Sequence, residues 1–301
     1  MQDSPRHDKW KGTTGGTTWM QKTLVLCLGW MNLPFVYSGM ALVIPFYMIF
    51  NHKGYISQYH FFRRRLGYGP LKAFCHVYLN HFTFGQIILD RFAVYGGAKF
   101  EVEIDGNPTF LQKVEGEEGF IQLSSHIGNF ELAGYMLSQD KKQINALIFG
   151  GETGTVMENR KRIFRHMNIK LITVGTDMAH VYAMNSALEQ GEIISMPGDR
   201  IFGSQKSITC DFMGAKAEFP MGPYILAASR DVPVLSIFVM KDSVYRYHIY
   251  VKEVRLPEDV ELKGAKAKAA CLAQAFANQL EDIVRKYPRQ WFNYYEFWGE
   301  E

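Results

Sequence analysis

The chain has 301 residues, of which 47% are hydrophobic, 14% aromatic and 21% charged. A single hydrophobic core stops growing near ~250 residues, so this length allows one large core with an added segment. The sequence contains no low-complexity tract and no block of like charges, which argues against a repeat protein or a disordered chain.

The charge balance and the cysteines exclude further classes. With 33 basic and 30 acidic side chains, the formal charge of +3 is too small for a nucleic-acid-binding surface, so no nucleic acid partner is expected. The cysteines show no CxxC pair and no Cys/His pair at metal-ligand spacing. We therefore expect no metal site, no disulfide framework and no cofactor, and we expect reduced thiols in a chain exposed to the cytoplasm.

The least polar segment is residues 23–52, which contains no Asp, Glu, Lys or Arg. One helix of this length would reach ~45 Å, and a bilayer core needs about 20 apolar residues, so a membrane span is possible by length. Pro34 and Pro45 argue against a single helix, because an interior proline costs ~3 kcal/mol. We predict two shorter helices that meet near residues 32–34.

The flanks of this segment are typical of a membrane surface. Trp10, Trp19 and Trp30 are residues that favour the membrane interface, and Arg63 to Arg65 form a basic cluster. Such a cluster gains ~1 kcal/mol per charge against anionic lipid, which predicts a cytoplasmic orientation. A cleaved signal peptide is not expected, because a polar stretch precedes the apolar residues. The alternative is a buried helical hairpin in a soluble core.

A helical pattern at 71–95 is followed, from residue 100 onward, by short β-branched apolar runs that alternate with helical patterns. Strands are predicted at 120–124, 146–149, 170–174, 193–196, 232–239 and 245–253, and helices at 129–138, 156–167, 178–190, 222–229 and 266–286. This order predicts an α/β fold with a mostly parallel central sheet flanked by helices. We expect a helical membrane-associating region at 1–95 and a catalytic α/β domain at 96–301.

The most informative motif follows the strand at 120–124 and reads His126-Ile127-Gly128-Asn129-Phe130-Glu131. We predict that one helical turn brings the Glu131 carboxylate to His126, so that the other ring nitrogen accepts a proton from a nucleophile. Such a general base contributes roughly 10²- to 10⁴-fold in rate. Gly128, with Asn129 beside it, is expected to let substrate approach the backbone, where helix-start amides would stabilise an oxyanion.

These residues resemble the signature of the lysophospholipid acyltransferase superfamily, in which a histidine, four residues and an acid follow one another. The form with Glu131 is most similar to the bacterial lipid A biosynthesis acyltransferase branch, including its aryl-polyene and flexirubin relatives. The resemblance extends over residues 119–239, and the aromatic segment 290–298 is similar to the end of that branch. Glu131 replaces the aspartate that is commoner in the wider superfamily, and the usual lipid A enzymes carry a different basic ending.

The resemblance implies further substrate-binding positions. A second family block places an arginine in a helix and matches Arg160 or Arg162, and a third matches Asp199, Arg200 and Gly203. The arginines are suited to phosphate on the acceptor or on a phosphopantetheine arm. Asp199 is expected to partner an arginine, with a structural role in the turn as the alternative.

The resemblance also implies the reaction. We expect a fatty acyl group to pass from an acyl carrier protein or coenzyme A thioester to a hydroxyl or amine of a lipid A-like, lysophospholipid or aminolipid acceptor, at the cytoplasmic face of the inner membrane. No Gly-x-Ser-x-Gly turn is present, which favours direct transfer over an acyl-enzyme. The alternatives are a non-catalytic lipid-binding protein of the same fold and a hydrolase that uses water as acceptor.

Overall fold

The structure is a computed structural model that describes residues 18–30, 32–50, 52–137, 140–149, 167–175, 177–201, 206–257 and 262–298. Several predictions concern residues outside these ranges. They are Trp10, nearly all of the helix predicted at 156–167, and the substrate-binding candidates Arg160, Arg162 and Gly203.

The amino-terminal region is helical. It consists of α1 (Thr18–Trp30), α2 (Leu33–Phe50), α3 (His52–His60), the π-helical turn η1 (Phe61–Arg65) and α4 (Pro70–Tyr95). The predicted break near residues 32–34 is confirmed, because Pro34 is the second residue of α2, where its missing N–H group has no intrahelical partner to lose. Pro45 does not end the helix, since α2 continues through it to Phe50.

Seven strands of the described residues form one sheet in the order β1-β9-β8-β2-β5-β3-β4. They are β1 (Glu101–Asp105), β2 (Phe120–Ser124), β3 (Ile144–Phe149), β4 (Ile169–Val174), β5 (Ile193–Pro197), β8 (Val234–Lys241) and β9 (Arg246–Glu253). The β8–β9 pair is antiparallel and the other neighbours are parallel. The predicted α/β fold with a mostly parallel sheet is therefore confirmed.

Two features of the sheet region were not predicted. The edge strand β1 has alternating exposed and half-buried residues, and three of its five residues are acidic. A separate antiparallel hairpin of β6 (Ser207–Phe212) and β7 (Ala215–Pro220) stands beside the main sheet. Neither has the continuous apolar run by which buried parallel strands are recognised.

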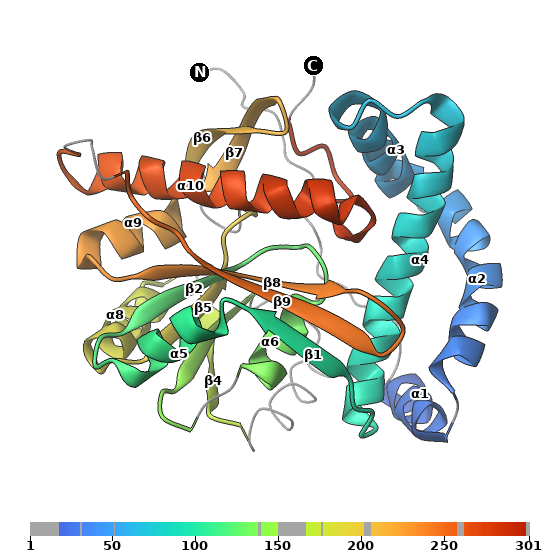
Figure 1. Cartoon of the computed structure of the whole chain (residues 1–301), viewed down its shortest axis with the longest axis horizontal. Coiled ribbons are helices and arrows are strands. Elements are labelled where there is room, and N and C mark those ends of the chain that lie inside the picture. The colour runs from blue at the N-terminus through green and yellow to red at the C-terminus, as the bar shows by residue number, and fades with distance from the viewer. Residues whose placement is uncertain are drawn as a thin grey trace.

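Helices cover both faces of the sheet (Figure 1). On one face, α5 (Asn107–Glu115) and α6 (Phe130–Met136) pack with Leu235, Ile237 and Val239 of β8. The alternate residues of β8, Phe238 and Met240, belong to the core cluster on the other face. That cluster includes residues of α8 (Ala179–Glu189), α9 (Met221–Arg230) and α10 (Ala265–Lys286). This double coverage keeps the strands buried and leaves their carboxyl ends for a site.

The helical region packs directly against the end of the chain. Gln58 Nε2 and Asn80 Nδ2 both donate to the backbone oxygen of Trp291, at 3.2 and 3.0 Å. Phe61 and Phe62 of η1 belong to the same core cluster as α10 and the sheet. The division into domains at residues 95 and 96 stays a prediction.

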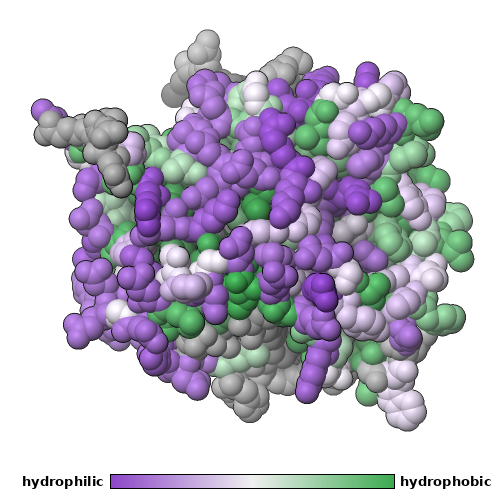
Figure 2. All heavy atoms as spheres, in the orientation of Figure 1, coloured by the Kyte–Doolittle hydropathy of each residue, from purple (hydrophilic) through white to green (hydrophobic). Residues whose placement is uncertain are grey.

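The helix α2 is long and apolar enough to cross a membrane, and only 22% of its residues are buried. Its outward side chains are 60 to 85% exposed and are Phe35, Leu42, Val43, Phe46, Ile49 and Phe50. We call these six residues the α2 apolar face. Figure 2 shows hydrophobic residues at the right-hand edge of the molecule, where Figure 1 places α2.

Candidate active site

The site forms where two neighbouring parallel strands end. Ser124, the last residue of β2, is the register partner of Pro197, the last residue of β5. His126 and Asp199 each follow two residues later, so the topology brings their side chains together at the carboxyl edge of the sheet. His126 Nδ1 lies 2.9 Å from Asp199 Oδ1.

Asp199 is held as a buried carboxylate. Its other oxygen, Oδ2, accepts hydrogen bonds from Ser125 Oγ and from the backbone N–H of His126, both at 2.8 Å. Burial acts to raise the pKa of Asp199, but the facing His126 and Arg200 outweigh it and lower the pKa to about 2. Because an ionised carboxylate can only accept, the His126 Nδ1 atom carries the proton in this hydrogen bond.

His126 has the properties of a neutral base. Burial and the positive charge of Arg200 lower the pKa of its imidazole, Asp199 opposes this effect, and Arg91 adds to it. With Nδ1 protonated, the lone pair of the neutral ring lies on Nε2. The side chain is 18% exposed, so the ring is not sealed inside the protein.

The predicted partner of His126 requires a correction. The carboxylate on the imidazole is that of Asp199, whereas Glu131 Oε1 accepts a hydrogen bond from Arg91 Nη1 of α4 at 3.0 Å. The helix α6 begins only at Phe130, so the five-residue spacing from His126 to Glu131 does not form one helical turn. Asp199, expected to partner an arginine, instead orients the histidine.

The predicted substrate contacts at Gly128 and Asn129 also need correction. The backbone N–H of Gly128 donates to Gln290 at 2.9 Å, and that of Asn129 donates to Val239 at 2.7 Å. These amides are therefore used by the fold and are not available to an oxyanion. The Asn129 side chain is fully buried, with Oδ1 accepting from Arg91 Nε at 3.1 Å and Nδ2 donating to the Tyr247 hydroxyl at 3.2 Å.

Gly128 is required by a close backbone approach. Its φ is +60°, and a Cβ atom there would lie 2.1 Å from the Val239 backbone oxygen. We predict that Gly128→Ala lowers the free energy of unfolding by about 3 kcal/mol, from left-handed backbone strain and overpacking together. Gly214→Ala is the control, because Gly214 has a φ of +81° but no atom within 4 Å of an added Cβ. Equal losses of stability in urea unfolding would contradict this explanation.

Arg200 lies beside the histidine and the carboxyl-terminal segment. Its Nη2 donates to the backbone oxygen of Phe292 at 2.7 Å, and its guanidinium stands 5.5 Å from the centre of the Tyr295 ring. Within the described ranges, the buried Nε atom of Arg200 has no hydrogen-bond partner. The guanidinium charge, which also lowers the pKa of the imidazole, is suited to a negatively charged group of a ligand.

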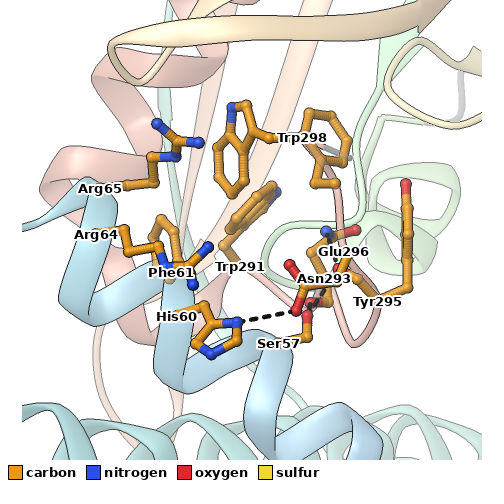
Figure 3. A pocket seen from close by; sticks show the side chains of 11 residues that line it. Ser57, His60, Phe61, Arg64, Arg65, Trp291, Asn293, Tyr295, Glu296 and Trp298 are labelled. Atoms are coloured by element: carbon orange, nitrogen blue, oxygen red, sulfur yellow. Dashed lines mark hydrogen bonds and ion pairs between the residues drawn. The ribbon is translucent and has the colours of Figure 1, made fainter. Parts of the chain in front are cut away.

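A pocket that Tyr295 helps to line lies between α3 with η1 and the aromatic end of the chain (Figure 3). Arg64 and Arg65, two members of the predicted basic cluster, line it. The Arg65 guanidinium is 4.6 Å from the centre of the Trp298 ring. Trp291 and Phe297 are buried, as expected for aromatic residues that complete a core. The pocket does not include His126, so it neighbours the candidate site without forming part of it.

Arg91 is a site residue that sequence reasoning missed. It contacts both Asn129 and Glu131, and its guanidinium lies 5.2 Å from the centre of the Phe130 ring. A signal was present, because Asp90 and Arg91 are the only charged residues between positions 73 and 98. No cluster of three or more His, Cys, Asp or Glu side chains suited to a metal occurs among the residues that the structure describes.

The charges around His126 predict a pH dependence. Among the described residues, the charged groups that act on its pKa are Asp199, Arg200 and Arg91, and Arg91 is paired with Glu131. A base must be neutral, so kcat/KM should fall in acid with a midpoint below the usual histidine pKa of about 6.5. Removing a cation raises the histidine pKa, so Arg91→Gln should move this acid limb to higher pH. Arg91→Lys keeps the charge, and an equal shift in both variants would contradict the prediction.

The comparisons with known proteins concern the same part of the chain. The sequence pattern of the family described as bacterial lipid A biosynthesis acyltransferase matches residues 97–298. Among solved structures, the chain is similar to the crystal structure of the 1-acyl-sn-glycerophosphate (LPA) acyltransferase PlsC from Thermotoga maritima. The two are 14% identical with a TM-score of 0.39, and the likeness covers 90% of this chain and 99% of that chain. The comparison with curated proteins found no match.

Proposed function

The chain belongs to the bacterial lipid A biosynthesis acyltransferase family, and on that premise we propose that His126 is the general base of its acyl transfer. The family assignment makes the chain an acyltransferase that acts on lipids, and it confirms the resemblance seen in the sequence. It also favours an enzyme over a non-catalytic lipid-binding protein. We further propose an acyl carrier protein or coenzyme A thioester as donor, and a hydroxyl or amine of an amphiphilic lipid as acceptor.

The observation that carries this proposal is the His126–Asp199 pair. Asp199 accepts the Nδ1 proton at 2.9 Å, so the lone pair of the neutral ring lies on Nε2, the atom that we propose acts as the base. In the proposed step, Nε2 takes the proton of the acceptor O–H or N–H group while the acceptor atom attacks the thioester carbonyl carbon. The tetrahedral intermediate then breaks its carbon–sulfur bond, and the departing thiolate takes the proton back from the imidazolium.

Direct transfer agrees with the environment of the nearest serine. Ser125 Oγ donates its proton to Asp199 Oδ2 at 2.8 Å, so its hydroxyl is committed to holding the carboxylate. A serine nucleophile needs its proton directed at a base. A thiolate is also a weaker base than an alkoxide, so its departure needs no strong acid. These points favour attack by the acceptor itself over an acyl-serine intermediate.

We propose that Arg200 binds the anionic part of the substrates. The Gly128 and Asn129 amides are used within the fold, whereas Arg200 Nε is buried next to the histidine without a partner in the described part of the chain. A guanidinium suits both a phosphate and a developing oxyanion. Arg160, Arg162 and Gly203 remain predicted substrate contacts. Glu131, ion-paired with Arg91, is proposed to keep that cation in place beside the base.

The test is acyl transfer by the purified full-length protein. A labelled acyl carrier protein thioester and, in parallel, the coenzyme A thioester are incubated with a lipid extract of bacterial membranes. Mass spectrometry should find a lipid whose mass has increased by one acyl group. Release of free fatty acid without an acylated lipid would instead identify a hydrolase. If neither an acylated lipid nor free fatty acid is formed, the proposal is overturned.

We propose that the α2 apolar face attaches the protein to the cytoplasmic face of the inner membrane. The support is its exposure together with the basic cluster Arg63 to Arg65 in the turn that follows α3. Phe46→Glu should reduce flotation with vesicles of phosphatidylethanolamine and phosphatidylglycerol. Tyr182→Glu is the matched control, because Tyr182 is 75% exposed but lies on α8, away from α2. Equal flotation of the two variants would contradict this assignment.

A further inference from the structure

A buried ion pair lies between α4 and the sheet, close to the candidate site. Lys241 Nζ of β8 donates to Asp90 Oδ2 of α4 at 2.6 Å, and both side chains are at most 5% exposed. The hydroxyls of Tyr37 and Tyr247 also donate to the Asp90 carboxylate. Lys241 additionally donates to the backbone oxygen of Val244 at 3.0 Å. Such a pair is retained at a high desolvation cost, and this one is fully hydrogen-bonded.

The hydrogen-bond network around Asp90 extends through Tyr247 to Asn129. Burial and the facing Asp90 raise the pKa of Tyr247 well above its ordinary value, so its hydroxyl stays protonated and donates to the carboxylate. The oxygen of Tyr247 is then left to accept, and it accepts from Asn129 Nδ2 at 3.2 Å. The Asn129 amide thereby turns its Oδ1 toward Arg91 Nε, 3.1 Å away.

Asp90 and Arg91, which are adjacent in α4, therefore both hold the side chain of Asn129. Asp90 reaches the Asn129 NH₂ group through Tyr247, and Arg91 reaches the Asn129 oxygen directly. Figure 1 shows α4 standing across the edge of the sheet, beside α2. Asn129 is the residue before α6 and lies three positions after His126, in the turn that carries the imidazole. These side-chain contacts thus add to the backbone hydrogen bonds that hold the far end of that turn.

We propose that Asp90, Arg91 and Tyr247 are positioning residues that hold the His126 turn in register with Asp199 through the side chain of Asn129. This inference rests on the proposed function of His126 as the base. A displacement of about 1 Å in a catalytic group can cost 10²-fold in rate. If the Asn129 side chain lost these contacts, the turn would keep only its backbone hydrogen bonds, and we expect the enzyme to turn over more slowly. Substrate contacts would not change, because none of these side chains is proposed to touch substrate.

The experiment compares two buried tyrosines of β9 in the full-length protein. Tyr247→Phe removes the hydroxyl that accepts from Asn129. Tyr250→Phe removes a hydroxyl that contacts Tyr287 and Lys286, on the α10 side of the strand. We expect about a ten- to hundredfold lower kcat for Tyr247→Phe with unchanged KM for the thioester, and wild-type kcat for Tyr250→Phe. Both variants should unfold at lower temperature.

A double variant tests the route through Asn129. Asn129→Ala should lower kcat as Tyr247→Phe does, and the combined variant should fall no further than Asn129→Ala alone. Losses that multiply, equal losses of kcat in Tyr247→Phe and Tyr250→Phe, or a normal kcat in Tyr247→Phe would each overturn the inference. If Tyr247→Phe does not fold, the Asn129→Ala variant provides the test, since it leaves the hydrogen-bond donors to Asp90 in place. A normal kcat in Asn129→Ala would then overturn the inference.

The failure of this inference is distinguishable from that of the proposed function. A His126→Ala variant that turns over normally removes the base and with it any reason to position its turn. An inactive His126→Ala variant together with a normal Tyr247→Phe variant retains the base and removes only the positioning role.

Discussion

The His126→Ala variant is expected to lose about 10²- to 10⁴-fold in kcat, the range that a positioned general base contributes. Its fold should persist, because Asp199 keeps two of its donors, Ser125 Oγ and the backbone N–H of residue 126. The buried carboxylate is then not left without hydrogen bonds, which would be the main threat to stability. Acyl transfer from labelled thioester and thermal unfolding measure the two effects.

His60→Ala is the matched control for this variant. His60 also pairs with a carboxylate, Glu296, at 3.2 Å, but its side chain is 35% exposed and it lies in α3, away from the strand ends. Its loss should leave turnover near the wild-type rate. Normal turnover in His126→Ala would remove the proposed mechanism, and a loss as large in His60→Ala would show that the assay reports on stability.

The sheet was predictable because its central strands are buried on both faces. Residues 120–124 and 234–241 are mostly apolar and have every position buried, which is the pattern that reveals such strands. The edge strand β1 reads Glu-Val-Glu-Ile-Asp and is half exposed, so its composition resembles a loop. The other edge strand, β4, is also partly exposed but reads Ile-Lys-Leu-Ile-Thr-Val, and it was predicted. Element type was therefore recoverable where apolar β-branched residues dominate, and was lost where acidic residues alternate with them.

The partner of His126 was not predictable, because it depends on strand order. In the chain, β3 and β4 both separate β2 from β5, yet β5 is the direct neighbour of β2 in the sheet. A sequence shows that polar residues follow both strands but not that the two strand ends meet. The register of Ser124 with Pro197 is what places Asp199 beside the imidazole.

The assignment of Glu131 failed for a local reason. The spacing to His126 suggested one helical turn, but the turn between them is irregular and contains Gly128 at a φ of +60°. The carboxylate therefore belongs to the first turn of α6, where it meets Arg91 of α4. A contact between residues 40 positions apart has no local signal beyond the presence of a charged pair in an otherwise apolar helix.

The Asp199→Asn variant should lose about as much activity as His126→Ala while keeping the fold, because the amide imposes the wrong tautomer. The oxygen of the introduced amide would still be required to accept from Ser125 and from the backbone N–H of His126, which now bond to Oδ2. The NH₂ group of that amide would then point at His126 Nδ1, which must accept. The ring proton moves to Nε2, where the base needs its lone pair. A carboxylate-to-amide change of this kind costs up to about 10⁴-fold in a catalytic triad.

Asp211→Asn is the control, since Asp211 is an exposed carboxylate of β6 that pairs with Lys216 at 2.8 Å and should be dispensable. Turnover and unfolding temperature are measured for both variants, with Glu131→Gln alongside. An Asp199→Asn variant that keeps the wild-type kcat while Glu131→Gln is inactive would return the role of orienting carboxylate to Glu131. A loss in Asp199→Asn with an unchanged unfolding temperature would support Asp199 as the carboxylate that orients His126, because the introduced amide can keep the hydrogen bonds to Ser125 and to the backbone while it reverses the tautomer.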